Sequence, residues 1–434
     1  MIPTRWLLFS IALLLLAGLA PALQPQLIPY WWGTLGLIAL VSLIDALLIW
    51  RQPLPQITRR LPGSLALGVP ETITLRLRHR GKRPQEMAVF DHYPPTLQVE
   101  GLPCTVNLAT EGYGDIRYHA RPLERGEAWF KGVQLRLLSP LRLWWRQSHI
   151  KLESQVRIYP NFAAVAKYTL LAADNRLSQM GIRKNRRRGE GQDFHQLREY
   201  RQGDPLRQID WKASARIRKL ISREYQEERD QEIIFLLDCG HRMLARDDEL
   251  SHFDHSLNAI LLLAYVALRQ GDGVGFGSFS GEQRWLQPIK GIGMINHLFN
   301  TLYDLQPSTR VPDYAAAATH LLLRQKKRAL VVLITNLRDE DNADLLPAIR
   351  LLRQRHLVLI ASMQEQALNQ ELDNRITDFE QALRHAATRD YLQSRGQVVD
   401  ALRASGIMCL DVIPKDLSVA LVNQYLDIKA SARL

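Results

Sequence analysis

Two long apolar runs at the start of the chain constrain its fold more than any other feature. Residues 6–23 contain no charged side chain and are rich in leucine, and residues 27–50 form a second run with a single acid, Asp45. A helix needs about 20 apolar residues to span a bilayer. Aromatic side chains lie at both ends of the second run, as is typical of membrane interfaces. The sequence therefore predicts a two-helix transmembrane anchor over residues 6–50.

Positive charges flank this anchor. Arg5 precedes the first run, and Arg51, Arg59 and Arg60 follow the second, whereas the loop between the runs has no Lys or Arg. Because Lys and Arg are enriched on the cytoplasmic side of membrane spans, we expect a multi-pass protein of a bacterial-type inner membrane with its soluble domains in the cytoplasm. A cleaved signal peptide is the alternative for the first run, but Pro21 argues against cleavage there.

Asp45 lies inside the second run, about one and a half helical turns before Trp50. An acid within a membrane span is a candidate functional residue. Its closeness to the interface favours the alternative, a carboxylate that reaches the lipid headgroups.

Residues 56–160 have a different pattern. Segments such as 72–78 and 133–137 alternate apolar and polar residues, which is the period of a strand with one buried face. Turn residues separate these segments, as at Arg80-Gly81-Lys82. We therefore expect a small all-β, sandwich-like domain.

Residues 231–434 alternate between apolar runs of strand length and segments with helical spacing. The run 233–237 is continuously apolar, as expected of a strand buried on both faces, and it ends at Asp238. A similar run, 329–335, precedes Asn336. This alternation predicts a doubly wound, Rossmann-like α/β domain, whose ligands gather at the carboxyl ends of the strands. The fold class is thus multidomain, with a membrane anchor, a β-domain and an α/β domain.

Residues 161–230 form a basic linker between these two domains. A dense cluster over Arg183–Arg188 contributes to the formal net charge of +12, which fits attraction to anionic lipid, nucleic acid or an acidic partner. No aromatic residues interleave with these arginines, which makes nucleic acid the weaker interpretation. Contact with lipid headgroups and a solvated, charged loop both stay open. The three cysteines are widely separated and match neither a disulfide framework nor a zinc site.

A signature rich in arginine, acidic and aromatic residues ends this linker. Its members are Arg198, Glu199, Tyr200, Gly203, Asp204, Arg207, Asp210, Trp211, Lys212, Ser214 and Arg216. It resembles the signature of a bacterial family known as domain of unknown function fifty-eight, the von Willebrand factor A-like proteins associated with MoxR-type AAA+ ATPases. The resemblance extends to the C-terminal segment 419–426. It implies a von Willebrand A-like α/β domain. The signature itself is interpreted as an ion-pair network that joins the β and α/β domains, or as a docking face for a partner.

The resemblance also implies a metal-ion-dependent adhesion site, built from Asp-x-Ser-x-Ser after the first strand and an acid after a later strand. At these positions the chain has Asp238, Gly240, Arg242 and Asn336, so both serines and the later acid are absent. Hydroxyl and carboxylate oxygens are what Mg²⁺ requires. We therefore expect a degenerate site that holds no metal. Arg242 either pairs with Asp238 or points into solvent.

The leading hypothesis is a membrane-tethered cytoplasmic adaptor that acts with a MoxR-type AAA+ ATPase in protein maturation or envelope remodelling. The ATPase partnership follows from the resemblance alone. The chain contains no nucleotide-binding Gly-x-x-x-x-Gly-Lys-Ser/Thr loop, and we expect no catalytic residues and no cofactor. Besides the ATPase, the expected partners are the lipid bilayer and other membrane or envelope proteins. Two alternatives stay open: an enzyme that uses Asp238 and His241, and a membrane-associated nucleic-acid-binding protein.

Overall fold

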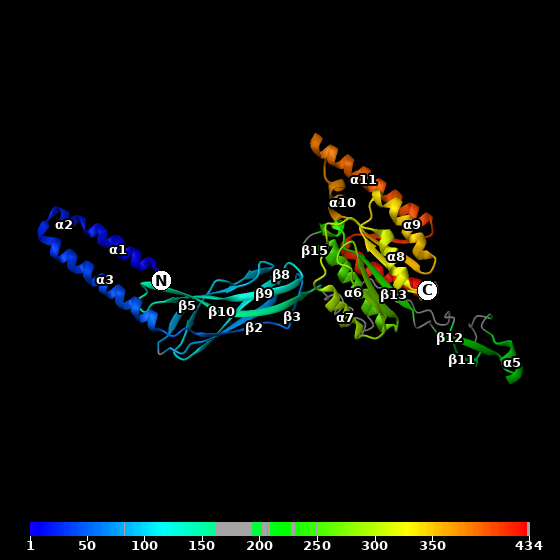
Figure 1. Ribbon diagram of the computed structural model, residues 1–434, viewed down its shortest axis with the longest axis horizontal. Coiled ribbons are helices and arrows are strands. Elements are labelled where there is room, and N and C mark those ends of the chain that lie inside the picture. Colours follow the sequence, from blue (N-terminus) through cyan, green and yellow to red (C-terminus); the bar gives the residue numbers. More distant parts are fainter. Residues whose placement is uncertain are drawn as a thin grey trace. The chain divides into compact units, whose positions relative to one another are not determined.

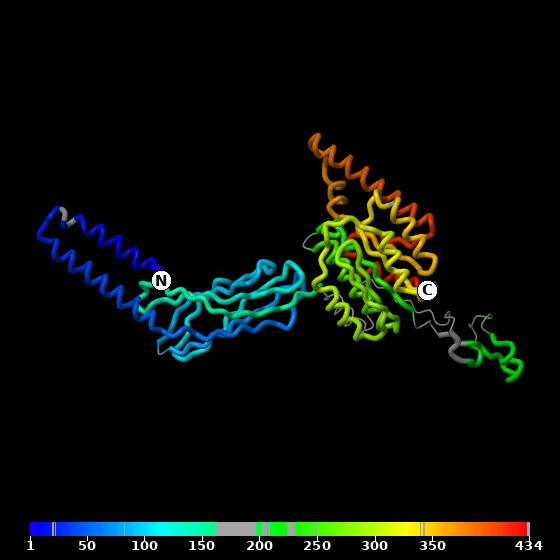
Figure 2. The backbone as a smooth tube through the Cα atoms, viewed as in Figure 1, coloured from blue at the N-terminus to red at the C-terminus, as the bar shows by residue number. Residues whose placement is uncertain are grey.

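The computed structural model describes residues 1–81, 83–161, 193–201, 206, 209–226, 231–247 and 250–431. The chain divides into two compact units, Met1–Tyr159 and Pro160–Leu434 (Figures 1 and 2). The first is rich in β-strands and the second is α/β, which confirms the expected multidomain class at this level. The cluster Arg183–Arg188 and the signature residues Gly203, Asp204 and Arg207 lie outside the described residues.

The first unit begins with a helical hairpin. Helix α1 (Arg5–Ala17) and the short α2 (Leu19–Leu23) lead away from the β-strands, and a 3₁₀ turn and α3 (Ile28–Arg51) return to them (Figure 1). The indole Nε1 of Trp31 on α3 donates a hydrogen bond to the carbonyl of Leu14 on α1 at 3.1 Å. Among the described helices, the segment Pro25–Arg51 is long and apolar enough to cross a membrane, whereas α1 has 13 residues.

Two antiparallel sheets follow in the same unit. One has the order β1-β10-β9-β5-β7, with β3 pairing in parallel with β10, and the other has the order β2-β4-β8-β6. The strands are β1 (Ile2–Pro3), β2 (Gln56–Arg60), β3 (Ser64–Ala66), β4 (Glu71–Arg78), β5 (Gln85–His92), β6 (Leu97–Glu100), β7 (Cys104–Leu108), β8 (Tyr113–Pro122), β9 (Gly126–Leu138) and β10 (Trp144–Tyr159).

The core of this β-domain contains a charged pair. Arg59 on β2 and Asp91 on β5 belong to different sheets, and both side chains are fully buried. The guanidinium bonds both carboxylate oxygens, at 3.0 and 2.6 Å, and the hydroxyl of Tyr118 donates to the same carboxylate at 2.6 Å. Arg59 therefore belongs to the sandwich core, and exposed positive charge after α3 comes instead from residues such as Arg51 and Arg60.

The second unit contains a six-stranded sheet of order β17-β16-β13-β18-β19-β20, in which β17 alone runs antiparallel. Its strands are β13 (Glu232–Asp238), β16 (Gly273–Phe279), β17 (Trp285–Ile289), β18 (Leu330–Thr335), β19 (Leu357–Met363) and β20 (Met408–Val412). The central strands β13 and β18 are almost entirely buried, as expected of parallel strands covered on both faces.

Helices cover both faces of this sheet (Figure 1). Apolar residues of α6 (His252–Arg269), α7 (Met294–Leu302) and α12 (Leu417–Ala430) share one buried cluster with the sheet. Those of α8 (Tyr314–Arg324), α9 (Asn342–Arg353) and α11 (Phe379–Ala404) share a second cluster. The short α10 (Gln366–Asp373) precedes α11. The described part of this unit is thus doubly wound.

The signature residues that the structure describes lie in a small hairpin with one helix. Strands β11 (Asp193–Glu199) and β12 (Ile221–Gln226) pair antiparallel, and α5 (Trp211–Ile217) lies between them in sequence.

Candidate functional site

The carboxyl ends of β13 and β18 form the first candidate site. Asp238 ends β13 and is fully buried. Its Oδ1 accepts a hydrogen bond from the backbone N–H of Gly240 at 2.8 Å, and its Oδ2 accepts one from the Thr335 hydroxyl at 2.8 Å. The Thr335 hydroxyl also lies 3.1 Å from the hydroxyl of Tyr314. The chain itself therefore supplies a partner for each carboxylate oxygen.

Burial dominates the electrostatics here. Removal from water raises the pKa of Asp238, and the hydrogen bonds from Thr335 and Gly240 only partly offset this effect. Burial likewise raises the pKa of the Tyr314 phenol. The site therefore disfavours negative charge unless a positive group compensates it.

Gly240 is required by close packing rather than by its backbone angle. A Cβ atom at this position would lie 2.9 Å from the carbonyl oxygen of Arg310 and 3.0 Å from Oδ1 of Asp238. Real Cβ atoms rarely approach neighbours so closely, so a side chain would push the loop away from Asp238.

Arg242 follows neither of the two expected alternatives. Its side chain is 3% exposed, so it does not point into solvent. Its guanidinium pairs with the carboxylates of Asp341 and Glu340, and not directly with Asp238. The short 3₁₀ helices His241–Leu244 and Asp339–Asp341 bring these residues together after β13 and β18. Arg242 therefore joins two loops at this edge of the sheet.

Asn336 is buried but belongs to a different group. Its Nδ2 donates to Oε1 of Glu365 at 2.9 Å and lies 3.4 Å from Nδ1 of His252. His252 in turn lies 3.1 Å from the carboxylate of Asp247. Thr335, and not Asn336, is therefore the residue of this strand end that contacts Asp238.

His241 does not form a dyad with Asp238. Its backbone N–H and its ring Nδ1 both face the carbonyl oxygen of Arg310, at 3.0 and 3.3 Å. The arrangement gives no support to the acid–base alternative for these two residues.

The residues at the expected adhesion-site positions do not fit a divalent cation. Both oxygens of Asp238 already accept hydrogen bonds, and a buried guanidinium with its own carboxylate partners lies in the same loop. Within the described residues, His, Cys, Asp and Glu side chains form no cluster of three or more that could hold a metal ion. No role in binding or chemistry is therefore assigned to a metal ion at these positions.

A further buried arginine, in the α/β unit, was not singled out from the sequence. Arg395 of α11 is 2% exposed and bonds both oxygens of Asp411 on β20, at 2.9 and 2.6 Å. It also donates to Ser362 and to the carbonyl oxygens of Leu337 and Met363. A lone arginine in an otherwise ordinary helix gives no sequence signal, because its partners lie on other elements.

The signature hairpin contains a polar network of its own. Asp210 caps α5 by accepting from the backbone N–H of Ala213 at 3.0 Å, and it pairs with Arg223 of β12 at 2.9 Å. These two contacts lower the pKa of Asp210. Ser214, which is buried, accepts from the backbone N–H of Ile221 at 2.9 Å.

Further signature contacts are exposed. Glu199 pairs with Lys219 at 2.5 Å, and both side chains are well exposed. Trp211 is 67% exposed, so it is not packed inside the hairpin. The reason is local: Ser214 is the residue of α5 that contacts β12, whereas Trp211 is the first residue of the helix. The remaining described members, Arg198, Tyr200, Lys212 and Arg216, lie on the same hairpin or on α5.

Asp45 makes a third site, at the base of the helical hairpin. It is fully buried, and its carboxylate accepts hydrogen bonds from the Ser139 hydroxyl at 2.5 Å and from the backbone N–H groups of Leu141 and Leu143, at 2.9 and 3.2 Å. The turn between β9 and β10 thus supplies all three donors. The expectation that Asp45 reaches the lipid headgroups is wrong.

Other contacts strengthen this junction. The indole Nε1 of Trp144 donates to the hydroxyl of Ser42 at 3.0 Å, and Arg146 donates to three carbonyl oxygens at the end of α3. Thr4 bonds the same turn from the other side: its backbone N–H donates to Leu143 at 2.9 Å and its hydroxyl donates to the carbonyl of Arg142 at 2.6 Å. Both ends of the helical hairpin are therefore fixed to one turn of the β-domain.

The chain is similar to a curated protein and to solved structures. It is 21% identical over 234 residues to "Uncharacterized protein YeaD" of Bacillus subtilis (strain 168). The aligned segment covers 52% of this chain and 54% of the relative. The chain therefore spans about half the length of this curated relative.

Similar solved structures include an aerotolerance-related membrane protein from Bacteroides fragilis NCTC 9343, at 15% identity and a TM-score of 0.29, covering 45% of this chain and 98% of that one. Another is native alpha-2-macroglobulin from Escherichia coli, at 17% identity and a TM-score of 0.20, covering 25% of this chain and 17% of that one.

A family model gives the most direct assignment. The family described as "Protein of unknown function DUF58" matches residues 196–405, which include most of the signature hairpin and most of the doubly wound sheet. This match confirms the resemblance that the signature residues indicate. Over residues 196–405, this chain is therefore similar to the DUF58 family of proteins of unknown function.

Proposed function

We propose that this protein is a membrane-tethered cytoplasmic adaptor without catalytic activity, which works with a MoxR-type AAA+ ATPase in the maturation or remodelling of envelope proteins. The observation that carries the tether is the Asp45 junction. It fixes an apolar helix of spanning length to a folded β-domain through three hydrogen bonds to one carboxylate. Movement of the domain is thereby coupled to the anchor.

The helical hairpin supports two spans. Helices α1 and α2 together cover residues 5–23, about 28 Å at a rise of 1.5 Å per residue, close to the ~30 Å of a bilayer core. Both ends of the hairpin meet the β-domain, through Thr4 at the start and Arg146 at the end. The exposed charges Arg5 and Arg51 lie at these ends, so the β-domain belongs on the cytoplasmic side.

The α/β unit supports an interaction role. Its parallel sheet with helices on both faces is the arrangement expected of a von Willebrand A-like domain. The carboxyl edge, where ligands of such sheets bind, holds Asp238 with both oxygens occupied by the chain's own donors. An internally paired edge favours binding of a protein surface over chemistry on a small molecule.

The signature hairpin offers a surface for a partner. Apolar side chains that are more than two-fifths exposed gather in this segment, namely Leu197, Leu206, Trp211, Ile217 and Leu220. Among them, Trp211 is of the residue type that most often dominates binding at protein interfaces. The choice of an AAA+ ATPase as the partner rests on the family resemblance.

Affinity capture tests the partnership. The full chain, tagged at its C-terminus and cross-linked in native membranes, is expected to retain a MoxR-type ATPase that mass spectrometry identifies. Trp211→Ala should lower its recovery at least fivefold, whereas Trp129→Ala, which removes a 52% exposed tryptophan of β9, should not. Recovery of no such ATPase, or equal loss in both variants, would refute the partnership.

Reporter fusions test the topology. A reporter that is active only in the periplasm should be silent when fused to the C-terminus, because the flanking arginines retain that side in the cytoplasm. The same reporter inserted between residues 23 and 26 should be active. Strong activity of the C-terminal fusion would overturn the orientation.

A further inference from the structure

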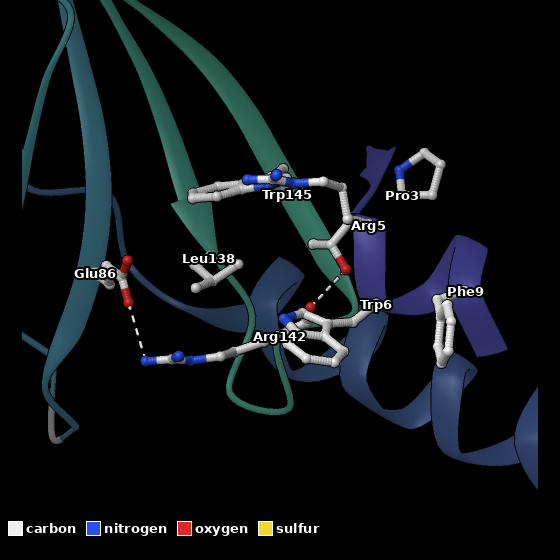
Figure 3. Close-up of a pocket in the computed structure, with 9 residues that line it drawn as sticks. Pro3, Arg5, Trp6, Phe9, Glu86, Leu138, Arg142 and Trp145 are labelled. Atoms are coloured by element: carbon white, nitrogen blue, oxygen red, sulfur yellow. Dashed lines mark hydrogen bonds and ion pairs between the residues drawn. The ribbon is translucent and has the colours of Figure 1, made fainter.

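A pocket of about 720 Å³ lies where α1 begins beside the β-domain. It is lined by residues of β1, α1, β5, β9 and β10, together with the turn that Asp45 holds. Figure 3 shows the side chains that line it, among them Arg5, Trp6, Phe9, Glu86, Arg142 and Trp145. None of the functions argued above uses this pocket.

Two arginines give the pocket its chemistry. Arg5 is the first residue of α1 and is exposed, and Arg142 lies in the turn between β9 and β10 with its side chain 66% exposed. The start of α1 adds the positive end of a helix dipole. A single acid, Glu86, faces them and pairs with Arg142 at 3.3 Å (Figure 3). The pocket is therefore suited to a group with one or more negative charges.

The aromatic residues indicate at which level of the bilayer the pocket lies. Trp6 and Phe9 on α1 are 66% and 63% exposed, and Trp145 lies on β10 across from them. Tryptophan collects at the level of lipid headgroups, where an apolar ring and a polar N–H both find partners. The pocket lies at the end of the apolar helices where Arg5 marks the expected cytoplasmic interface.

An apolar groove lies on the opposite face of α1: Trp144 of β10 lines the groove, whereas Trp145, the next residue of the strand, lines the pocket. It has a volume of about 390 Å³ and runs between α1 and α3, lined mainly by Leu7, Leu8, Ile11, Leu15, Trp31 and Leu35. Trp6 and Phe9, which line the pocket beside Arg5, are therefore the exposed apolar side chains of α1 next to the pocket.

We propose that this pocket binds one anionic glycerophospholipid, with its phosphate at Arg5 and Arg142 and its acyl chains along the exposed face of α1 that carries Trp6 and Phe9. The inference rests on the proposed membrane span of these helices. A lipid phosphate competes with the Glu86 carboxylate for Arg142. Glu86 therefore lowers the affinity of the pocket for an anionic headgroup. Charge complementarity favours phosphatidylglycerol over a zwitterionic lipid with the same chains.

Native mass spectrometry of the full chain in a neutral detergent tests the proposal. We expect one phosphatidylglycerol to bind at least tenfold more tightly than phosphatidylcholine with identical chains, because two arginines each contribute to binding of anionic lipid. The double variant Arg5→Gln/Arg142→Gln should bind both lipids equally. Glu86→Gln should raise the affinity for phosphatidylglycerol.

Arg51→Gln is the matched control, because it removes one exposed positive charge at the same end of the hairpin but does not line the pocket. It should leave the preference unchanged, and the thermal unfolding midpoint of every variant should match that of the native chain. Equal affinity of the native chain for the two lipids would overturn the proposal. So would an unaltered preference in the double variant, or a fall in affinity with Glu86→Gln.

Two further measurements separate the possible failures. Inorganic phosphate that binds as tightly as the lipid would show a site for soluble anions and overturn the lipid assignment. Extraction of the native chain from membranes by alkaline carbonate would refute the membrane span, and with it the proposed function. A chain that resists carbonate but shows no lipid preference would refute only the lipid site.

Discussion

The Asp45 carboxylate and the Ser139 hydroxyl lie 2.5 Å apart, although 94 residues separate them in the sequence. This contact joins an apolar helix to the turn between the two longest strands of the β-domain, β9 and β10. Because Asp45 also accepts two backbone hydrogen bonds from the same turn, one side chain satisfies three donors that would otherwise be left unpaired.

Removal of this carboxylate should loosen the turn. Asp45→Ala leaves the buried Ser139 hydroxyl and two partly buried N–H groups without their acceptor. An unsatisfied buried group costs about 1–3 kcal/mol, so we expect a lower unfolding midpoint of the full chain in detergent and faster proteolysis between residues 139 and 144. Leu47→Ala on the same helix truncates a 48% exposed residue and serves as the control. Equal proteolysis rates in the two variants would show that the junction does not hold the turn.

The Arg59–Asp91 pair gives a second stability prediction. Asp91→Ala leaves a fully buried guanidinium without its carboxylate, which costs about 3–5 kcal/mol when a buried pair is broken in this way. Asp115→Ala breaks the exposed pair with Arg76 and should leave the unfolding midpoint nearly unchanged. Unfolding of both variants by guanidinium chloride in the same detergent measures the difference. A similar loss of unfolding free energy in both would place Asp91 in contact with water.

The elements of the second unit were largely predictable from the sequence. The apolar run 233–237 corresponds to β13, and the run 329–335 includes β18. Strands that are covered on both faces carry apolar residues on both, so they appear in the sequence as continuous apolar runs. Strand β17, which contains Trp285, follows β16 in the sequence and pairs with it antiparallel. Here the local pattern determines the element.

The partners of the buried charges were not predictable in this way. Arg242 and Asp341 are 99 residues apart, and only the parallel arrangement of β13 and β18 brings their loops together. A single sequence shows that Arg242 follows a strand but does not show which acid it meets. The same holds for Asp45, whose three donors lie on a turn that no periodicity connects to α3.

The raised pKa of Asp238 predicts a dependence of stability on pH. Because burial raises the pKa of this carboxyl in the folded state, folding favours its protonated form, and that contribution is lost as the pH rises through the folded pKa. Asp238→Asn removes the ionisation and keeps the shape. We expect the stability of the variant relative to the native chain to increase as the pH rises above about 4, the usual pKa of an aspartate. Thermal unfolding at pH values above this point checks it, and a constant difference would contradict the assignment.

The signature residues Asp210 and Trp211 should respond differently to substitution by alanine. Asp210→Ala removes the cap of α5 and the partner of Arg223, so we expect a lower unfolding midpoint than for Arg187→Ala in the basic cluster. Trp211→Ala removes an exposed side chain and should leave the midpoint unchanged while it weakens partner capture. A large loss of stability in Trp211→Ala would show that the tryptophan is packed in the assembled protein, and would favour the interdomain role.

The last prediction concerns metal binding. An adhesion site of the von Willebrand A type offers hydroxyl and carboxylate oxygens to Mg²⁺, which keeps several waters and tolerates little distortion of its octahedron. At the corresponding positions this chain has one carboxylate, Asp238, whose oxygens accept from Gly240 and Thr335. A cation would have to displace these donors.

We therefore expect no specific Mg²⁺ or Mn²⁺ site, and partner binding that does not depend on divalent metal. Isothermal titration of the EDTA-treated full chain in detergent measures this directly, with Asp238→Ala as the comparison. Addition of EDTA should also leave the recovery of the captured partner unchanged. A stoichiometric Mg²⁺ signal of micromolar affinity that Asp238→Ala abolishes would contradict the prediction. It would mean that the loop after β13 rearranges to release the carboxylate, and that the adhesion site is functional despite Gly240 and Arg242.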